Sequence, residues 1–346
     1  QCLERAAKRK ADTEYIIFRG GDGVYKFSKR KIIYVWISVL MVSVSGFCMD
    51  TMNEDKVHTP QKLRIGTTIS VFGGLQGLTY ENLKEARSAG ISDIEISLTG
   101  LVNGDHPIPN AELKEKFRQV KHNADSAGIN IWSIHMPYGA DCDPSHIDET
   151  IRSHSENAYR SYIDVVSVLE PEVILFHPSW RLGLNERKER MSQLVKTITS
   201  LNKDVKEIGA IIVLENLLGY KLLRSPGVER PLGRTVEEMV EIMDLMPADV
   251  YAAVDMNHIK NPELLIAALG SRIKSVHIAD GDGEKECHQL PGRGKNNWVL
   301  ILQALDHAGY TGPFLYEIRA KEVDGFTDLV TAYNLLYENY TKSLQP

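Results

Sequence analysis

Cysteine is scarce in this chain of 346 residues, which contains only four. Two of them, Cys142 and Cys287, lie beyond residue 49, and two cysteines so far apart do not make a disulfide framework, although an exported protein could form one bridge. Long apolar stretches are missing as well. Residues 32–44 offer about 13 mostly apolar positions, fewer than the roughly 18 that a membrane-spanning helix needs. The chain is therefore neither a small disulfide scaffold nor a bundle of membrane spans.

The stretch from residue 26 to residue 48 has the order of a secretory signal peptide: basic residues, then the apolar run, then small residues. Cys48 lies where a lipoprotein signal places its acylated cysteine, although Phe47 stands where a small residue is usual. We expect residues 1–49 to form a leader and residues 50–62 a short linker. The protein would then be exported, either to the periplasm or to a membrane that it joins through a lipid on Cys48. The alternative is a misplaced start site.

Basic residues are concentrated in the leader, so the rest of the chain is acidic. Residues 1–49 hold nine Lys and Arg against four Asp and Glu, which leaves 31 against 42 and a net charge of −11. A domain with this balance repels nucleic-acid phosphates unless a local basic patch intervenes. We expect no nucleic-acid partner.

Hydrophobic residues make up 43% of the chain and charged residues 25%, a balance typical of a globular protein with a real core. From residue 63 onward, eight short apolar or β-branched runs alternate with stretches of helical periodicity. The runs are LRIGTTIS from residue 63, DIEISL from 93, INIWSIHM from 129, EVILFH from 172, AIIVLE from 210, VYAAVD from 250, RIKSVHIA from 272 and PFLYEI from 313. The helical stretches are TYENLKEARSAG, NAELKEKFRQVKHNADSAG, ERKERMSQLVKTITSLNKDVKEIG, TVEEMVEIMDLM, NNWVLILQALDHAGY and FTDLVTAYNLLYENY.

This alternation predicts an α/β fold, a single-domain (β/α)8 TIM barrel that is the catalytic domain over residues 63–346. A doubly wound open sheet is the competing arrangement, and it would usually carry a glycine-rich phosphate turn after its first strand. SVFGGLQG, from residue 70, has glycines but not at the dinucleotide-binding spacing. The barrel is therefore favoured.

Six consecutive predicted strands end in residues that bind metals or move protons, and a barrel brings such ends together in one pocket. In chain order these residues are His135, His177, Glu215, Asp255, His277 and Glu317. Any one alone has an ordinary explanation, as a core histidine or as a carboxylate that meets solvent. Carboxylates and imidazoles that point together repel or desolvate one another, and a bound divalent cation removes that penalty. The strand ends therefore predict a metal site.

The types of ligand narrow the choice of metal. Glu215, Asp255, His277 and Glu317 form an oxygen-rich set that suits Mn²⁺, Mg²⁺ or Co²⁺ at least as well as Zn²⁺. If the remaining imidazoles also ligate, the extra nitrogens favour Zn²⁺ and more than one ion; these are His135, His177 and His258.

The strand ends resemble the xylose isomerase-like TIM-barrel superfamily, the group called sugar phosphate isomerase/epimerase, which also includes endonuclease IV. The resemblance covers roughly residues 63–340 and rests on LEN with Glu215, VDMNH with Asp255 and His258, VHIAD with His277, HQLPGRG with His288 and YE with Glu317. It implies one metal held by Glu215, Asp255, His277 and Glu317. It also implies that Glu215 and Glu317 are the catalytic pair, which moves a proton off and onto the carbon next to a carbonyl through an enediolate.

The same resemblance implies a small carbohydrate substrate and a barrel that forms homo-oligomers. His258 would hydrogen-bond a substrate oxygen, and Arg293 lies where the family often places a substrate contact. Trp180, just after the fourth strand, either stacks on a sugar face or anchors its loop. The complete set that we predict to bind substrate is His135, His177, His258, His288, Arg293 and Trp180.

Two other functions stay open. Endonuclease IV holds three zinc ions, and the matching residue types here are His135, His177, Glu215, Asp255, His258, His277, Glu286, His288 and Glu317, with Glu286 where that group has Asp. The third function is a non-catalytic barrel that binds a sugar or keeps a structural metal, which would not need both Glu215 and Glu317 at an open pocket. An acidic domain without a Lys- or Arg-rich stretch over the barrel mouth is a poor DNA binder, so we favour the carbohydrate enzyme.

Overall fold

The computed structural model describes residues 59–180, 186–218, 232–282 and 285–345, and the backbone of a hairpin near the start of the chain. The chain divides into two units, Gln1–His58 and Thr59–Pro346. The hairpin belongs to the first unit and pairs β1 (Tyr15–Gly20) with β2 (Gly23–Ser28) in antiparallel register. The predicted signal segment, residues 32–44, and the predicted lipid site Cys48 lie outside the described residues, so both stay predictions. Among the helices that the structure describes, none has the length and apolar character to cross a bilayer.

The second unit contains eight parallel strands in one sheet, in the order β10-β3-β4-β5-β6-β7-β8-β9. They are β3 (Ile65–Thr68), β4 (Asp93–Ser97), β5 (Asn130–His135), β6 (Val173–Phe176), β7 (Ile211–Glu215), β8 (Val250–Asp255), β9 (Ile273–His277) and β10 (Phe314–Tyr316). The ring closes just beyond β9, where the amide of Ile278 donates to the carbonyl of Leu315 at 2.8 Å. Each of the eight runs contains one strand, and the predicted TIM barrel is confirmed.

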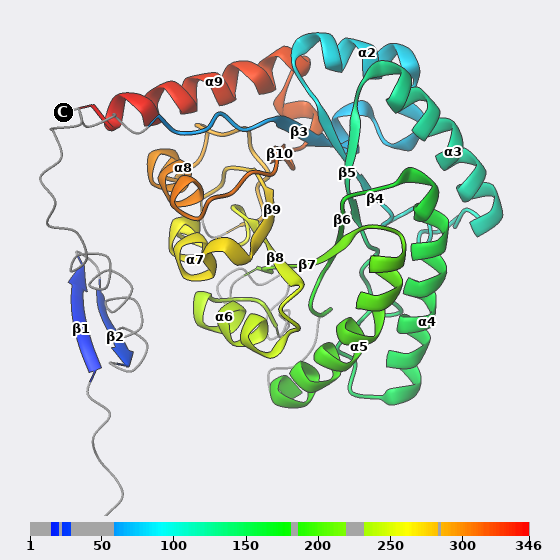
Figure 1. Cartoon of the computed structure of the whole chain (residues 1–346), viewed down its shortest axis with the longest axis horizontal. Helices are drawn as coiled ribbons and strands as arrows, with labels where there is room; N and C mark the ends of the chain where they lie inside the picture. The colour runs from blue at the N-terminus through cyan, green and yellow to red at the C-terminus, as the bar shows by residue number, and fades with distance from the viewer. Residues whose placement is uncertain are drawn as a thin grey trace, which may run out of the picture. The chain divides into compact units, whose positions relative to one another are not determined.

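Helices surround the strands in chain order, as Figure 1 shows. They are α2 (Tyr80–Ala89), α3 (Asn110–Ala127), α4 (Glu149–Val166), α5 (Arg187–Glu207), α6 (Val236–Leu245), α7 (Pro262–Leu269), α8 (Trp298–His307) and α9 (Phe326–Ser343). Single 3₁₀ turns occur at η1 (Ile69–Phe72), η2 (Leu75–Gly77), η3 (Ser167–Leu169), η5 (Gly270–Arg272) and η6 (Ala320–Glu322). Six of the helices match the predicted stretches, whereas α4 and α7 were not identified in the sequence.

Local sequence explains where several helices begin and end. The hydroxyls of Thr79 and Thr235 accept hydrogen bonds from the backbone amides of Asn82 and Glu238, which satisfies otherwise unpaired donors in the first turns of α2 and α6. Gly90 ends α2 in the left-handed conformation at φ 112°, which glycine adopts without strain. These caps fix the loop lengths and hence the path of the chain back to the next strand.

The barrel lumen is filled by side chains from strands on all sides. A separate cluster of buried residues packs there, comprising Trp132, Val173, Leu175, Val213, Ala253 and Leu315. The larger cluster joins the outer faces of the strands to the helices. A lumen packed with apolar groups is not a channel, so a functional site must lie above this layer.

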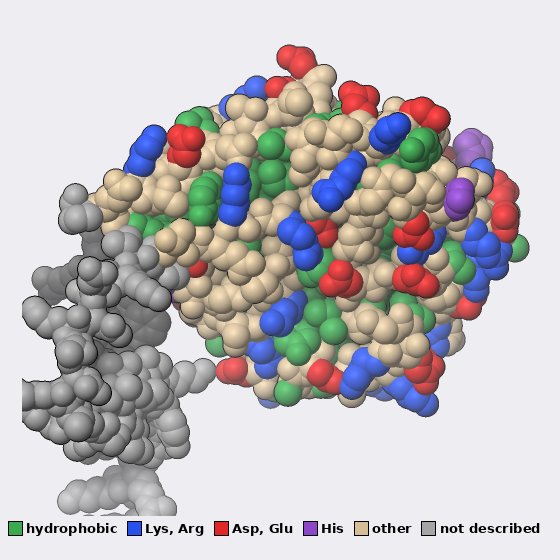
Figure 2. Space-filling model, turned by 45° about the horizontal axis from the view of Figure 1, so that its top comes forward, with side chains coloured by type: hydrophobic (Ala, Val, Ile, Leu, Met, Phe, Trp, Pro, Cys, Tyr) green, Lys and Arg blue, Asp and Glu red, His purple; other side chains and the backbone are tan. Residues whose placement is uncertain are grey.

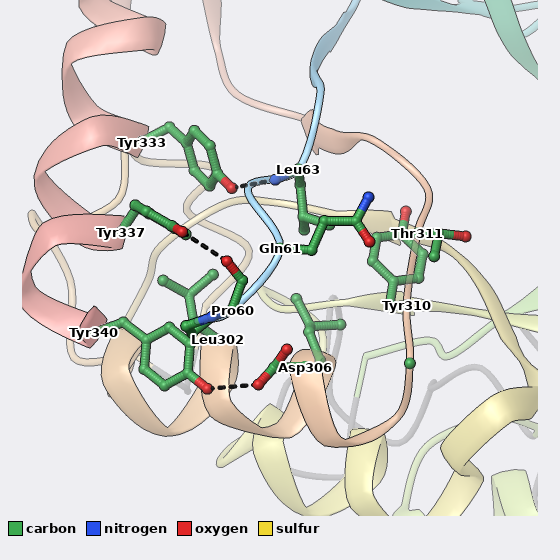
Figure 3. A pocket seen from close by; sticks show the side chains of 12 residues that line it. Pro60, Gln61, Leu63, Leu302, Asp306, Tyr310, Thr311, Tyr333, Tyr337 and Tyr340 are labelled. Atoms are coloured by element: carbon green, nitrogen blue, oxygen red, sulfur yellow. Dashed lines mark hydrogen bonds between the residues drawn. The ribbon is translucent and has the colours of Figure 1, made fainter. Parts of the chain in front are cut away.

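Tyrosines of α9 fasten the segment that enters β3, at the end of the barrel where the strands begin (Figure 3). The hydroxyl of Tyr333 accepts from the amide of Leu63 at 2.6 Å, and the hydroxyl of Tyr337 donates to the carbonyl of Pro60 at 2.7 Å. The cavity beside them has a volume of about 80 Å³, and none of the predicted site residues lines it. This end of the barrel is therefore closed by packed side chains and contains none of the predicted site residues.

Charges of both signs are mixed on the outer helices. Figure 2 shows acidic and basic side chains interspersed on the face in view, without a continuous basic patch. Several are paired between helices, as in Arg160 with Asp204 at 3.1 Å and Lys196 with Glu149 at 2.6 Å. Exposed pairs of this kind contribute little stability each.

Candidate functional site

The pleat of the strands delivers the predicted site residues to one place. Side chains of a strand alternate between its two faces, so a residue two positions after a lumen residue also points into the barrel. Val213 and Ala253 lie in the lumen, and Glu215 and Asp255 follow each of them by two positions at the strand ends. The same spacing relates Leu175 to His177 and Leu315 to Glu317. The apolar lumen layer is therefore capped by a layer of carboxylates and imidazoles.

Four of these side chains form the centre of the site. Glu215, Asp255, His277 and Glu317 each offer a ligand atom, and the four atoms lie within 4.8 Å of one another. Nδ1 of His277 is 3.0 Å from Oε1 of Glu215 and 3.0 Å from Oε2 of Glu317. Glu215, Asp255 and His277 are buried, whereas the Glu317 side chain keeps 26% of its surface exposed.

The oxygens of this cluster fit a divalent cation. Among the described residues, no hydrogen bond reaches Oε2 of Glu215, Oδ2 of Asp255 or Oε2 of Glu317, although all three atoms are buried. Imidazole nitrogens lie at 3.0 to 3.4 Å from these oxygens but without hydrogen-bond geometry. Buried carboxylate oxygens without donors are costly, and three carboxylates with one imidazole are a donor set that Mn²⁺, Mg²⁺, Co²⁺ and Zn²⁺ accept.

Burial and neighbouring charge act against each other on the central groups. Burial alone would lower the pKa of His277, but the carboxylates of Glu95, Glu317 and Glu215 raise it well above its usual value. Burial would raise the pKa of Glu215, yet His277 and its other imidazole neighbours hold that pKa well below the usual range. Without a cation, protonated imidazoles therefore neutralise the carboxylates, and a metal would displace those protons on binding.

Asp255 shows the opposite response. Burial raises the pKa of Asp255 to about 7, and the carboxylates of Glu317 and Glu215 act in the same direction. Its Oδ1 accepts from the amide of Asn257 at 2.6 Å, while Oδ2 lies 3.1 Å from Nδ1 of His258. Asp255 is thus the carboxylate whose charge the metal-free site accommodates worst.

Two further groups adjoin the central four. His135 and His177 place their Nε2 atoms 3.4 and 3.1 Å from Oε2 of Glu215. On the other side, His258 and His288 each place Nε2 at 3.4 Å from Oε1 of Glu286. Each group is a potential ligand set for a cation. The structure therefore brings together all nine residues that matched endonuclease IV in type.

Backbone carbonyls orient three of the histidines. Nδ1 lies 2.9 Å from the carbonyl of Met136 in His135, 3.0 Å from that of Asn216 in His258, and 2.9 Å from that of Glu317 in His288. A carbonyl only accepts, so Nδ1 carries the proton in each ring and Nε2 is left to face the site. Fixing the tautomer in this way is what a metal-binding or substrate-binding imidazole requires.

A pocket of about 450 Å³ opens above the cluster. Glu317, His135 and His288 line it, together with Tyr138. The Tyr138 ring stacks on His177 at 4.2 Å between centroids and 14° between planes, and Trp180 lies 5.6 Å from Tyr138. The volume and the aromatic wall suit a ligand the size of a small sugar.

Residues 83–337 match the family model described as xylose isomerase-like TIM barrel. The chain belongs to this family. The fold and the sequence thus agree on one classification, and the predicted resemblance is confirmed.

Relatives of this xylose isomerase-like barrel include proteins of assigned and unassigned activity. An uncharacterised protein of Methanocaldococcus jannaschii is 26% identical over 206 residues, which cover 55% of this chain and 67% of that protein. Fructoselysine 3-epimerase of Shigella flexneri is 21% identical over 170 residues, covering 48% of this chain and 59% of the enzyme. Among solved structures, a D-tagatose 3-epimerase-like protein superposes with a TM-score of 0.65 at 22% identity, over 82% of this chain and all of the other. L-ribulose 3-epimerase gives 0.61 at 17% identity, over 82% and 97%.

Three residues of the xylose isomerase-like site were missed in the sequence. Glu95, on β4, contacts His277, and Glu95, Tyr138 and Arg319 all line the pocket. Glu95 occupies an inward position of DIEISL, a signal that was present but not used. Arg293, predicted to bind substrate, is 54% exposed and pairs with Glu322 at 3.1 Å, and it does not line this pocket.

Proposed function

We propose that the chain is a metal-dependent sugar isomerase or epimerase that moves a proton at a carbon next to a carbonyl. The observation that carries the proposal is the cluster of Glu215, Asp255, His277 and Glu317, whose ligand atoms lie within 4.8 Å of one another and whose Glu317 lines a sugar-sized pocket. Relatives and structural neighbours named as 3-epimerases of fructoselysine, tagatose-like sugars and L-ribulose support the same class.

The four central residues would hold the cation. When bound there, it would polarise the carbonyl and hydroxyl oxygens of the sugar and so acidify the adjacent C–H bond. Glu317 lines the pocket and is the carboxylate placed to take or return a proton. Glu215 is 1% exposed and is the second member of the proposed acid/base pair. Two carboxylates acting from opposite faces of the carbon would invert its configuration.

Polar and aromatic groups around the cluster would orient the sugar. His288 and His258 keep Nε2 directed at the site and can hydrogen-bond hydroxyl groups, while Tyr138 and Trp180 offer apolar ring faces to the sugar's C–H bonds. We propose a substrate-binding role for His135 and His177 on the same grounds.

Solvent-exchange measurements test this function. Purified protein with Mn²⁺ or Co²⁺ is incubated with D-tagatose, D-psicose, D-fructose and L-ribulose in D₂O, and deuterium at the carbon next to the carbonyl is followed by NMR. We expect incorporation with at least one sugar, and its loss by a factor of about 10² or more in Glu317→Gln and in Glu215→Gln. An exchange rate that is unchanged in Glu317→Gln refutes the acid/base assignment.

A phosphodiesterase of the endonuclease IV type is the second candidate, because the structure contains three potential ligand groups rather than one. The groups of His135, His177 and Glu215 and of His258, Glu286 and His288 would hold additional zinc ions. Elemental analysis separates the candidates: one Mn or Co per chain supports the epimerase, and three Zn with cleavage of abasic-site DNA support the phosphodiesterase. The acidic character of the chain beyond residue 49 favours the epimerase.

A further inference from the structure

His277 is held differently from the other histidines of the site. Its Nε2 lies 2.9 Å from Oε1 and 3.1 Å from Oε2 of Glu95, a carboxylate on β4 at the far side of the lumen from β9. Both side chains are buried, with 1% of Glu95 and none of His277 exposed. We propose that Glu95 is a positioning residue of the cation site, which fixes the ring of His277 so that Nδ1 is its ligand atom.

The contrast with the other three rings supports this assignment. His135, His258 and His288 each donate Nδ1–H to a backbone carbonyl, which leaves Nε2 for the site. In His277 the roles of the nitrogens are exchanged, because Nδ1 faces Glu215 and Glu317 at 3.0 Å and Nε2 faces away from them. A second partner is then needed at Nε2, and Glu95 supplies it.

Glu95 is itself oriented for this contact. The hydroxyl of Ser133, on the neighbouring strand β5, donates to Oε2 of Glu95 at 2.6 Å. Glu95 borders the pocket but is only 1% exposed, so its carboxylate requires donors from the protein. Ser133 and His277 are the donors that meet it. The chain Ser133, Glu95, His277 therefore runs across the lumen from β5 to the cation site.

A carboxylate does more at Nε2 than a carbonyl would. It accepts Nε2–H, which selects one tautomer, and its negative charge makes Nδ1 a stronger electron donor to a metal. Removing Glu95 would free the ring to reorient and leave Nε2–H without a partner. Outer partners of this kind typically change metal affinity by about 10- to 100-fold.

This inference rests on the proposed cation site, so the experiment measures cation affinity directly. Mn²⁺ and Zn²⁺ are titrated into the metal-free full chain by calorimetry, for wild type, Glu95→Gln and Glu95→Ala. We expect affinity to fall about 10- to 100-fold in Glu95→Ala and less in Glu95→Gln, because the amide oxygen still accepts Nε2–H. In the Zn²⁺-bound wild type, ¹⁵N-histidine NMR should show a slowly exchanging Nε2–H that Glu95→Ala lacks.

Asp93→Asn is the matched control. Asp93 lies on the same strand with the same 1% exposure, but it pairs with Arg64 at 3.1 Å at the opposite end of the barrel. We expect it to lower the melting temperature without changing cation affinity. If wild type and both Glu95 variants bind the cation with equal affinity, the proposal for Glu95 is wrong while the cation site itself stands. The proposal is equally wrong if the variants change only KM for the sugar, because Glu95 would then contact the substrate rather than position His277. A wild type that binds no divalent cation overturns the cation site and this inference together. If Glu95→Ala does not fold, the isosteric Glu95→Gln decides the matter.

Discussion

Replacing Asp255 by Asn in the metal-free protein should raise its stability above pH 7, which is the reverse of the usual effect of altering a buried polar residue. Asp255 is fully buried, and one of its oxygens lacks a hydrogen bond from the residues described around it. Asn keeps the acceptor that the amide of Asn257 uses and removes the charge. The substitution therefore isolates the energetic cost of ionising this position.

The pKa of Asp255 gives the magnitude. Burial raises that pKa to about 7, against about 3.9 in an unfolded chain. Between those values the folded state binds the proton more tightly than the unfolded state, so wild-type stability falls as the pH rises from 4 to 7 and stays low above it. About three pKa units at 1.36 kcal/mol each correspond to about 4 kcal/mol at most. Asp255→Asn lacks this fall, because it has no proton to lose.

Urea unfolding in EDTA from pH 4 to pH 8 measures the difference. We expect the variant and wild type to be nearly equal at pH 4 and the variant to be about 2–4 kcal/mol more stable at pH 8. Mn²⁺ at a thousand times its Kd would stabilise wild type by about 4 kcal/mol and cancel the advantage, because the variant lacks one charged ligand. A difference that is independent of pH, or a variant that is less stable at pH 8 without metal, refutes the reasoning.

Two substitutions, one in the wall of the pocket and one outside it, test which residues contact the substrate. Tyr138→Ala removes the ring that lines the pocket and stacks on His177, so kcat/KM for the active sugar should fall about 3- to 10-fold while cation affinity in calorimetry stays the same. A fall in cation affinity would show instead that Tyr138 acts on the ligands. Arg293→Ala should leave kcat/KM within about twofold, because the guanidinium is exposed and already paired with Glu322. A tenfold loss in that variant would support the substrate contact that the family resemblance implied for Arg293.

The residues at the strand ends could be predicted from the sequence because two structural regularities apply to them. Side chains alternate along a strand, and a barrel brings all carboxyl-terminal strand ends to one side. A polar residue that ends a buried run, such as Glu215 or Asp255, is therefore assigned to the site without knowledge of any contact. That the central residues hold a cation and transfer protons stays a prediction.

The two helices that were missed, α4 and α7, have weak helical signals in their own sequences. Helix α4 has buried Arg152 and Ser155 on its inner face, and Arg152 is accepted there because Glu149 and Glu156 pair with it. The first half of this face is therefore polar, and only Tyr159, Ile163 and Val166 in the second half recur as apolar residues at helical spacing. Helix α7 has eight residues, too few for a periodic pattern to be recognised.

Glu95 illustrates a second limit, because its role depends on a contact between distant segments of the chain. Its inward position follows from the alternation in DIEISL, but Asp93 has the same alternation and pairs with Arg64 instead. What separates the two is the partner across the lumen, 182 positions away in the chain. Two positions along β4 thus separate a carboxylate that pairs with Arg64 from one that contacts His277.

The position of the cluster directly above an apolar layer also determines how strongly a cation would act. Val213, Ala253 and Leu315 lie two residues below Glu215, Asp255 and Glu317, so the charged layer has hydrocarbon beneath it and water only on the pocket side. Coulomb interactions are stronger over a medium of low polarisability, and this holds for repulsion among the carboxylates as well as for their attraction to a cation. The arrangement that destabilises the metal-free protein is therefore the one that makes a bound divalent ion effective. Substitutions of Val213, Ala253 or Leu315 that let water into the apolar layer should therefore weaken both the repulsion among the carboxylates and their attraction to a cation.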